Sequence, residues 1–201
     1  MVYKKRIQAE YSNIMLCLAA DMSYWTGVKH MSEPERQIAA PCGLVVGAVL
    51  GIAGTFASSA SLRGLLWGID GAALVVAGAL LAIYHVGRVN RLVAAGFLVF
   101  VAGETLILST VATPLGSSGP AFGAGASLWA ASLVMVSIPK ILPVWVRVAG
   151  IAAAVLFSIV SVELFLGQSL DALSKPLPFF AYPVLALTMF GWAWAHYRAA
   201  A

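Results

Sequence analysis

The sequence predicts an all-α membrane protein, a polytopic bundle of about six transmembrane helices with no soluble domain. Hydrophobic residues make up 61% of the 201 residues and charged residues only 10%, and the mean hydropathy is +0.93. Soluble domains are nearer half apolar and a quarter charged, and a chain of this size has too much surface to hide so many apolar side chains from water. A bilayer-spanning helix needs about 20 mostly apolar residues, so six spans and their loops nearly fill the chain.

Residues 1–36 differ from the rest because they hold nine of the charged residues. The apolar run at 14–20 is too short to span a bilayer. It follows a basic start and ends in Ala19-Ala20, as a signal peptide does, but its apolar core is at the short limit for one. A second interpretation is that translation starts at Met31, so that the preceding residues are an upstream extension. Mass analysis of the native N-terminus would exclude this interpretation if Met1 were intact.

Six apolar stretches follow, and each is bounded by charge or by proline and glycine. Arg63 and Arg88 flank the second stretch, Pro114 follows the third, Pro139 ends the fourth, and a polar segment with two prolines precedes the sixth. The spans are expected at residues 39–60, 65–86, 92–112, 121–138, 144–167 and 179–196.

Glycines at four-residue spacing mark the first two spans as packing surfaces. Gly43, Gly47 and Gly51 lie on one helix face of the first span, and Gly68 belongs to a similar set in the second. Small residues at this spacing let another helix approach closely. Because several partner helices belong to the same chain, packing within the protomer is favoured, and a homo-oligomer through these faces is the alternative.

Lysine and arginine are distributed unequally between the two ends of the predicted bundle. Ten of the twelve lie on the side of the N-terminus, and only Arg63 and Lys175 lie on the other. Cytoplasmic loops carry the excess of these residues, so the N-terminus is expected in the cytoplasm, and an even number of spans puts the C-terminus there too. This topology signal explains the net charge of +4. Nucleic acid is excluded as a partner because the basic residues form no patch with stacking aromatics.

Three acidic residues fall inside the predicted spans: Asp70, Glu104 and Glu163. Ionisable groups inside a membrane are costly and are commonly functional. At 1.5 Å per residue they lie roughly 10, 13 and 6 Å below the outer surface, each on a different helix. If these helices face one centre, the acids form a cluster that opens outward. The competing interpretations are that Asp70 pairs with Arg63 through water, since the two share a helix face, and that Glu163 reaches surface water.

Glu104 is the deepest of the three acids and begins a polar stretch. Thr105 and Ser109 follow at four-residue spacing and could line a water path, although hydroxyls bonded back to their own helix are the favoured interpretation. Removal from water favours the protonated form of a carboxyl group, which suits proton coupling or a pH sensor. Paired carboxylates would instead attract an organic or metal cation. The sequence leaves this choice open.

Other chemistry has little support in the sequence. It contains no P-loop, nucleophile elbow or zinc-protease helix motif, so an enzyme is disfavoured without being excluded. His85 and His196 fall at predicted helix ends, away from the depth at which a haem or metal site in the bilayer would need them. Cys17 and Cys42 lack the spacing of metal or redox motifs. No cofactor and no metal site are therefore expected.

The stretches Gly103-Glu104-Thr105 and 178–183 give the chain a resemblance to small polytopic inner-membrane proteins of bacteria that carry no assigned function. The resemblance covers residues 39–198. It implies the bacterial inner membrane and brings no active site with it.

Two functions remain open at the level of the sequence. One is a small transporter, a proton- or cation-coupled carrier with an outward-facing acidic cavity. The other is a non-catalytic membrane scaffold or stress-related subunit that uses its glycine-rich helices as packing surfaces. Lipid is the partner that the composition requires, and the sequence does not specify a small-molecule or ion ligand.

Overall fold

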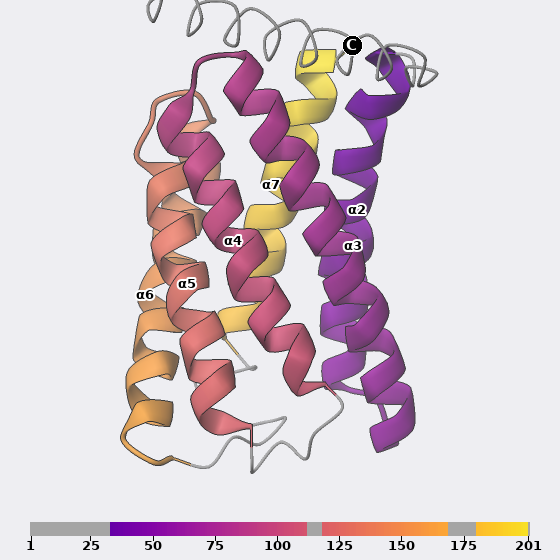
Figure 1. Ribbon diagram of the computed structural model, residues 1–201, viewed down its shortest axis with the longest axis vertical. Helices are drawn as coiled ribbons and strands as arrows, with labels where there is room; N and C mark the ends of the chain where they lie inside the picture. The colour runs from indigo at the N-terminus through magenta and orange to yellow at the C-terminus, as the bar shows by residue number, and fades with distance from the viewer. Residues whose placement is uncertain (1–32, 112–117, 169–179, 201) are drawn as a thin grey trace, which may run out of the picture. The chain divides into compact units, whose positions relative to one another are not determined.

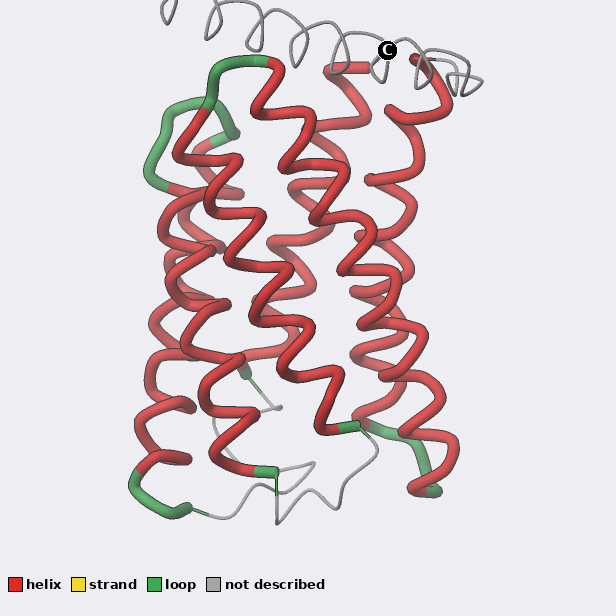
Figure 2. Tube along the Cα trace, in the orientation of Figure 1, coloured by secondary structure: helices red, strands yellow, loops and turns green. Residues whose placement is uncertain are grey.

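The computed structural model describes residues 33–111, 118–168 and 180–200. The chain divides into two units, 1–33 and 34–201, and the description concerns the helices of the second. The described residues form six α-helices and no strand: α2 (Glu33–Thr55), α3 (Ala60–Gly87), α4 (Arg91–Thr110), α5 (Gly119–Ser137), α6 (Val144–Phe165) and α7 (Ala181–Ala200). Figure 1 shows α7 behind α4, and Figure 2 shows the connections gathered at the two ends of the helices. The signal-peptide and Met31 interpretations fall outside the described residues.

Five of the described helices, α2 to α6, are long and apolar enough to cross a membrane. Their outer faces carry large apolar side chains, and Val76, Ile83, Leu98 and Val148 are all more than half exposed. Soluble monomers rarely expose apolar surface on this scale, whereas lipid accepts it. The predicted all-α membrane bundle is therefore confirmed, and the chain is a multi-pass integral membrane protein.

The sixth predicted span corresponds to α7, which is less apolar than the membrane-spanning stretches of the other five helices. Its tryptophans and tyrosines, together with His196 and Arg198, lower its mean hydropathy. It nevertheless supplies core side chains, since Leu185 and Trp192 are almost fully buried. Its 20 residues give a length of about 30 Å, the thickness of the hydrocarbon core. Pro183 lies in its first turn, where a missing N–H costs nothing. A sixth crossing stays a prediction.

Polar side chains fix the ends of several helices. α3 begins earlier than predicted because Ser59 caps it, accepting a hydrogen bond from the Leu62 N–H at 3.2 Å. At the opposite end of the bundle, Arg147 of α6 donates from Nε to the Ser137 carbonyl at 2.8 Å and from Nη2 to the Ile138 carbonyl at 3.0 Å. These carbonyls end α5 and have no partner within their own helix, so Arg147 ties α5 to α6.

The glycine face of α2 packs against α3 within the protomer. A Cβ atom on Gly43 would lie only 2.9 Å from the Cβ of Ala77, and one on Gly47 would overlap the side chain of Leu74. The two helices can approach this closely only because these residues are small. Gly68 is different, because no described atom lies within 4 Å of the position its Cβ would take.

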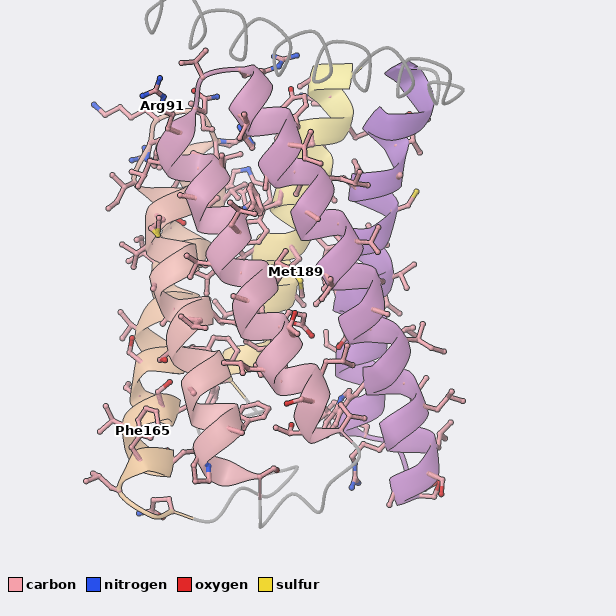
Figure 3. All side chains as sticks on the ribbon, viewed as in Figure 1. Arg91, Phe165 and Met189 are labelled. Carbon is pink, nitrogen blue, oxygen red and sulfur yellow. The ribbon has the colours of Figure 1, made fainter. Side chains whose placement is uncertain are left out.

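Aromatic rings fill the centre of the bundle in a connected series that we call the aromatic column. Neighbouring rings in the column have centroids 5.1 to 6.3 Å apart, and all of its rings except Tyr182 are buried. Met189 of α7 lies in the same interior, whereas Arg91 and Phe165 mark opposite ends of the bundle (Figure 3). The column consists of Phe97, Phe100, Trp129, Phe157, Tyr182 and Trp192.

Candidate functional site

A partly enclosed cavity of about 180 Å³ lies where α3, α5 and α7 begin and α4 ends, at the lower end of the view in Figure 1. We call it the acidic cavity, because Asp70 of α3 and Glu104 of α4 both line it. Two of the three acids singled out in the sequence therefore share one cavity. The other lining residues that matter below are Arg63, Trp67, Trp129 and Tyr182.

Asp70 is 9% exposed and reaches the cavity beside the glycine face of α2. A Cβ atom on Gly51 would lie 2.9 Å from Asp70 Oδ2, so the glycine makes room for the carboxylate. Trp67 Nε1 donates a hydrogen bond to the Gly51 carbonyl at 3.1 Å, which joins α3 to α2 at this level. Asp70 Oδ1 is buried and has no hydrogen-bond partner among the described residues.

Glu104 is buried more deeply and is 3% exposed. It lies between two glycine contacts. A Cβ atom on Gly71 of α3 would be 3.0 Å from Glu104 Oε1, and one on Gly103 of α4 would be 2.9 Å from the carbonyl oxygen of Gly125 on α5. Small residues thus bring α3, α4 and α5 close together around this carboxyl group. Its Oε2 is buried and also has no hydrogen-bond partner in the described part of the chain.

The aromatic end of the cavity is formed by Trp129 of α5 and Tyr182 of α7. Their rings are 6.3 Å apart at an interplanar angle of 74°, and Trp129 also packs edge-on against Phe157 at 5.1 Å. The indole N–H of Trp129 approaches Glu104 without forming a hydrogen bond of ordinary geometry. Aromatic faces and edges therefore lie beside carboxylate oxygens that lack partners.

Arg63 lines the cavity but does not neutralise Asp70. Its Nη2 donates to the carbonyl of Ala57 at 3.1 Å, and its guanidinium carbon lies 5.9 Å from the ring centroid of Trp67. No ion pair joins Arg63 to Asp70, although both belong to the described residues. A direct ion pair between these two described residues is therefore absent, because the guanidinium is held by the turn between α2 and α3. The contact through water considered from the sequence stays a prediction.

The remaining sequence candidates lie elsewhere. Glu163 is half-buried on α6 and does not line the acidic cavity. Thr105 and Ser109 are exposed on the outside of α4, where Thr105 Oγ1 donates to the Val101 carbonyl at 2.8 Å and Ser109 Oγ to that of Leu106 at 2.6 Å. Such hydrogen bonds within the same helix are the interpretation that the sequence favoured over a water path lined by these hydroxyls.

A second buried polar cluster, the histidine pair, joins the other ends of α3 and α7. His85 and His196 are 3% and 9% exposed, and their Nε2 atoms are 2.9 Å apart. His196 Nδ1 lies 2.7 Å from the carbonyl of Trp192, which can only accept, so this nitrogen carries the proton. His196 Nε2 then accepts from His85 Nε2, and His85 Nδ1 accepts from Asn90 Nδ2 at 3.5 Å. Every ring nitrogen has a partner, with both rings neutral.

The sequence interpretation missed the histidine pair because it considered only depth in the membrane. The helical period could have found it. His85 follows Leu74, Ala77 and Leu81 on the buried face of α3, and His196 follows Trp192 by four residues on α7. Positions three, four or seven residues apart share a helix face. The helical period therefore predicts that the rings of His85 and His196 point into the bundle.

No protein-family model, curated protein or solved structure matches this chain. Its function is therefore argued from the site alone. Among the described residues, no group of three or more His, Cys, Asp and Glu side chains could hold a metal ion. What the acidic cavity offers is negative charge, aromatic surface and space, within a multi-pass membrane protein.

Proposed function

We propose that the protein is a small carrier whose acidic cavity binds a cation and couples its movement to protons. The observation that carries this proposal is the pair of buried carboxyl groups, Asp70 and Glu104, each with an oxygen that lacks a hydrogen-bond partner among the described residues. Such groups are expensive inside a membrane unless something pairs with them. Carboxyl groups that bind a proton and a cation alternately, and not both at once, are the chemical basis of coupled exchange.

Access from one end of the bundle favours a carrier over an open channel. The cavity lies where α3 begins, and the aromatic column, including the fully buried Phe100 and Trp192, fills the core beyond it. The excess of lysine and arginine belongs to the opposite end, which favours a cavity on the outer side and both termini in the cytoplasm. The resemblance noted from the sequence makes the bacterial inner membrane the proposed location.

The alternative is a non-catalytic scaffold or stress-related subunit that assembles through glycine-rich faces. It has less support, because α3 of the same protomer already occupies the glycine face of α2, as the contact of Gly43 with Ala77 illustrates. An apolar groove lined by Val45, Phe190 and Trp194 is the surface that a homo-oligomer would use instead. Lipid chains fill such a groove equally well, so it does not favour a partner protein.

Water access to Glu104 is the first test. In a Cys17→Ala, Cys42→Ala background, Glu104→Cys should react with a membrane-impermeant maleimide added to intact cells. Thr105→Cys is the matched control, because it neighbours Glu104 at nearly the same depth but lies on the outside of α4, and it should stay unlabelled. Absence of labelling at position 104, with Ser117→Cys still reacting, would support a dry structural role. Labelling of Ser117→Cys only after the cells are opened would reverse the proposed orientation.

Coupled transport is the second test. Purified protein is reconstituted into liposomes loaded with a pH-sensitive dye, and gradients of Na⁺, K⁺, Mg²⁺ or choline are imposed in separate runs. A carrier that exchanges protons for cations should give proton counterflow with at least one of these ions. Glu104→Gln and Asp70→Asn should abolish the signal, whereas Glu163→Gln should retain it. A signal from no cation, or one that survives both cavity substitutions, would contradict the proposal.

A further inference from the structure

We infer that the ligand of the acidic cavity is a small organic ammonium ion, held between the carboxylates of Asp70 and Glu104 and the aromatic wall of Trp129 and Tyr182. The inference rests on the proposed function and deepens it by naming the class of cation. Charge, wall chemistry, volume and the number of available ligands all support the same class.

The charge of the lining favours a cation. Two carboxyl groups line the cavity against one guanidinium, and the Nη2 of that guanidinium is engaged by the Ala57 carbonyl. Asp70 Oδ1 and Glu104 Oε2 are themselves buried without partners among the described residues, so no described residue neutralises either carboxyl group, and a cation in the cavity would supply the missing opposite charge. Hydrogen bonds to charged groups are the stronger kind, and here they would replace no existing bond within the protein.

The wall of the cavity suits an organic cation better than a hydrated inorganic one. Trp67, Trp129 and Tyr182 all line it, and aromatic faces attract ammonium and guanidinium groups within about 6 Å of the ring centroid. The Arg63 guanidinium already lies 5.9 Å from the Trp67 centroid at this cavity. An alkyl ammonium ion would bury its carbon atoms against the other rings while its charge faces Asp70 and Glu104.

The volume sets the size of the ligand. An apolar cavity of about 150 Å³ holds one benzene molecule, so the acidic cavity, at about 180 Å³, has room for roughly six to eight non-hydrogen atoms. Choline and tetramethylammonium fall within or just below this range. A single dehydrated metal ion would leave most of the space unfilled.

The number of oxygen ligands also disfavours a bound metal ion. Calcium takes six to eight oxygens, and magnesium requires near-octahedral coordination. The cavity supplies two carboxyl groups, and among the described residues no cluster of three metal-binding side chains was found. An ammonium ion needs no such cage, because its charge is satisfied by two carboxylates and by aromatic faces.

Equilibrium binding of radiolabelled choline to the purified full chain in detergent tests the inference. Saturable binding should be displaced by unlabelled tetramethylammonium. It should not be displaced by 3,3-dimethyl-1-butanol, the neutral analogue in which carbon replaces the choline nitrogen. Glu104→Gln should weaken binding at least about tenfold, the effect of losing one charged partner. Glu163→Gln should bind as the wild type does.

A pair of glycine substitutions tests the position of the site without removing charge. Gly71→Ala puts a methyl group 3.0 Å from Glu104 Oε1 and 2.9 Å from Leu108 Cδ1, so it should shift the carboxyl group and weaken choline binding about three- to tenfold. Gly68→Ala is the matched control three residues earlier on α3, where a Cβ atom meets open space. It should leave binding unchanged.

The outcomes separate this inference from the proposed function. If choline shows no saturable binding while Na⁺, K⁺ or Mg²⁺ drives proton counterflow in the liposomes, the cavity serves an inorganic cation and the inference is wrong. Displacement by the neutral analogue, or choline binding that survives both Glu104→Gln and Asp70→Asn, would also overturn it. If no cation binds and none drives counterflow, the proposed function fails together with the inference.

Discussion

The histidine pair and the acidic cavity are both buried polar clusters, and α3 and α7 contribute to each. Asp70 and His85 are separated by about 22 Å along α3 at 1.5 Å per residue, and the aromatic column lies between the two clusters. In the histidine pair, hydrogen bonds account for all four ring nitrogens. In the acidic cavity, Asp70 Oδ1, Glu104 Oε2 and Trp129 Nε1 have no partner among the described residues.

This contrast separates a structural role from a functional one. A satisfied hydrogen-bond network stabilises the fold, whereas a buried polar group without a partner costs about 1 to 3 kcal/mol. Proteins tolerate such a cost mainly where a ligand or a reaction requires it. The two clusters should therefore respond in opposite ways when their polar groups are removed.

The largest expected effect is on the histidine pair. His196→Ala should lower the free energy of unfolding by about 3 kcal/mol, because it empties a buried ring site and leaves His85 Nε2 without an acceptor. SDS-titrated unfolding in mixed micelles measures this change. Tyr197→Ala, at a neighbouring exposed position, is the control and should cost much less. A loss below about 1 kcal/mol for His196→Ala would mean that the network contributes little to the fold.

The next effect is on packing at Glu104. Gly71→Ala should destabilise the protein by about 1 to 2 kcal/mol, because the added methyl group meets Leu108 and Glu104 at 2.9 and 3.0 Å. Gly68→Ala should be neutral or stabilising by up to about 1 kcal/mol, since alanine favours a helix more than glycine does. The same unfolding assay compares the two. Equal effects would indicate that α3 does not pack against α4 as described.

The third effect is a gain in stability. Glu104→Gln replaces a buried carboxyl group that has an unpaired oxygen with a neutral amide, so it should leave the free energy of unfolding unchanged or raise it by about 1 kcal/mol. When both are measured on the same sample, the free energy of unfolding should stay the same or rise, whereas the affinity for choline should fall. Destabilisation by more than about 1 kcal/mol would instead assign Glu104 a structural role like that of the histidine pair.

The smallest effect is expected on the outside of α4. Thr105→Val should change the free energy of unfolding by less than about 0.5 kcal/mol, because the hydroxyl of this exposed residue only bonds back to the Val101 carbonyl. Proton counterflow in liposomes should also be unchanged. Loss of counterflow in Thr105→Val would instead support the interpretation that Thr105 and Ser109 line a water path.

The sequence by itself determined the class of protein and most of the helices. Apolar runs long enough to span a bilayer leave a chain no soluble alternative, because hydropathy and helix length depend only on local composition. It also identified Asp70 and Glu104, since a charge within an apolar run is visible without any partner. Helix ends were predicted less well, and α3 began earlier because the Ser59 cap depends on one side-chain hydrogen bond.

Only the tertiary structure decided which polar residues meet. Asp70 and Glu104 share a cavity while Glu163 does not, because the outcome depends on how each helix is rotated about its axis. The same rotation turns Thr105 and Ser109 outward and brings His85 to His196 across 111 positions of the sequence. In lipid, apolar residues suit both the outside and the inside of a bundle, so hydrophobic periodicity fixes rotation weakly. Close contacts of glycines, such as Gly71 beside Glu104, fix it instead.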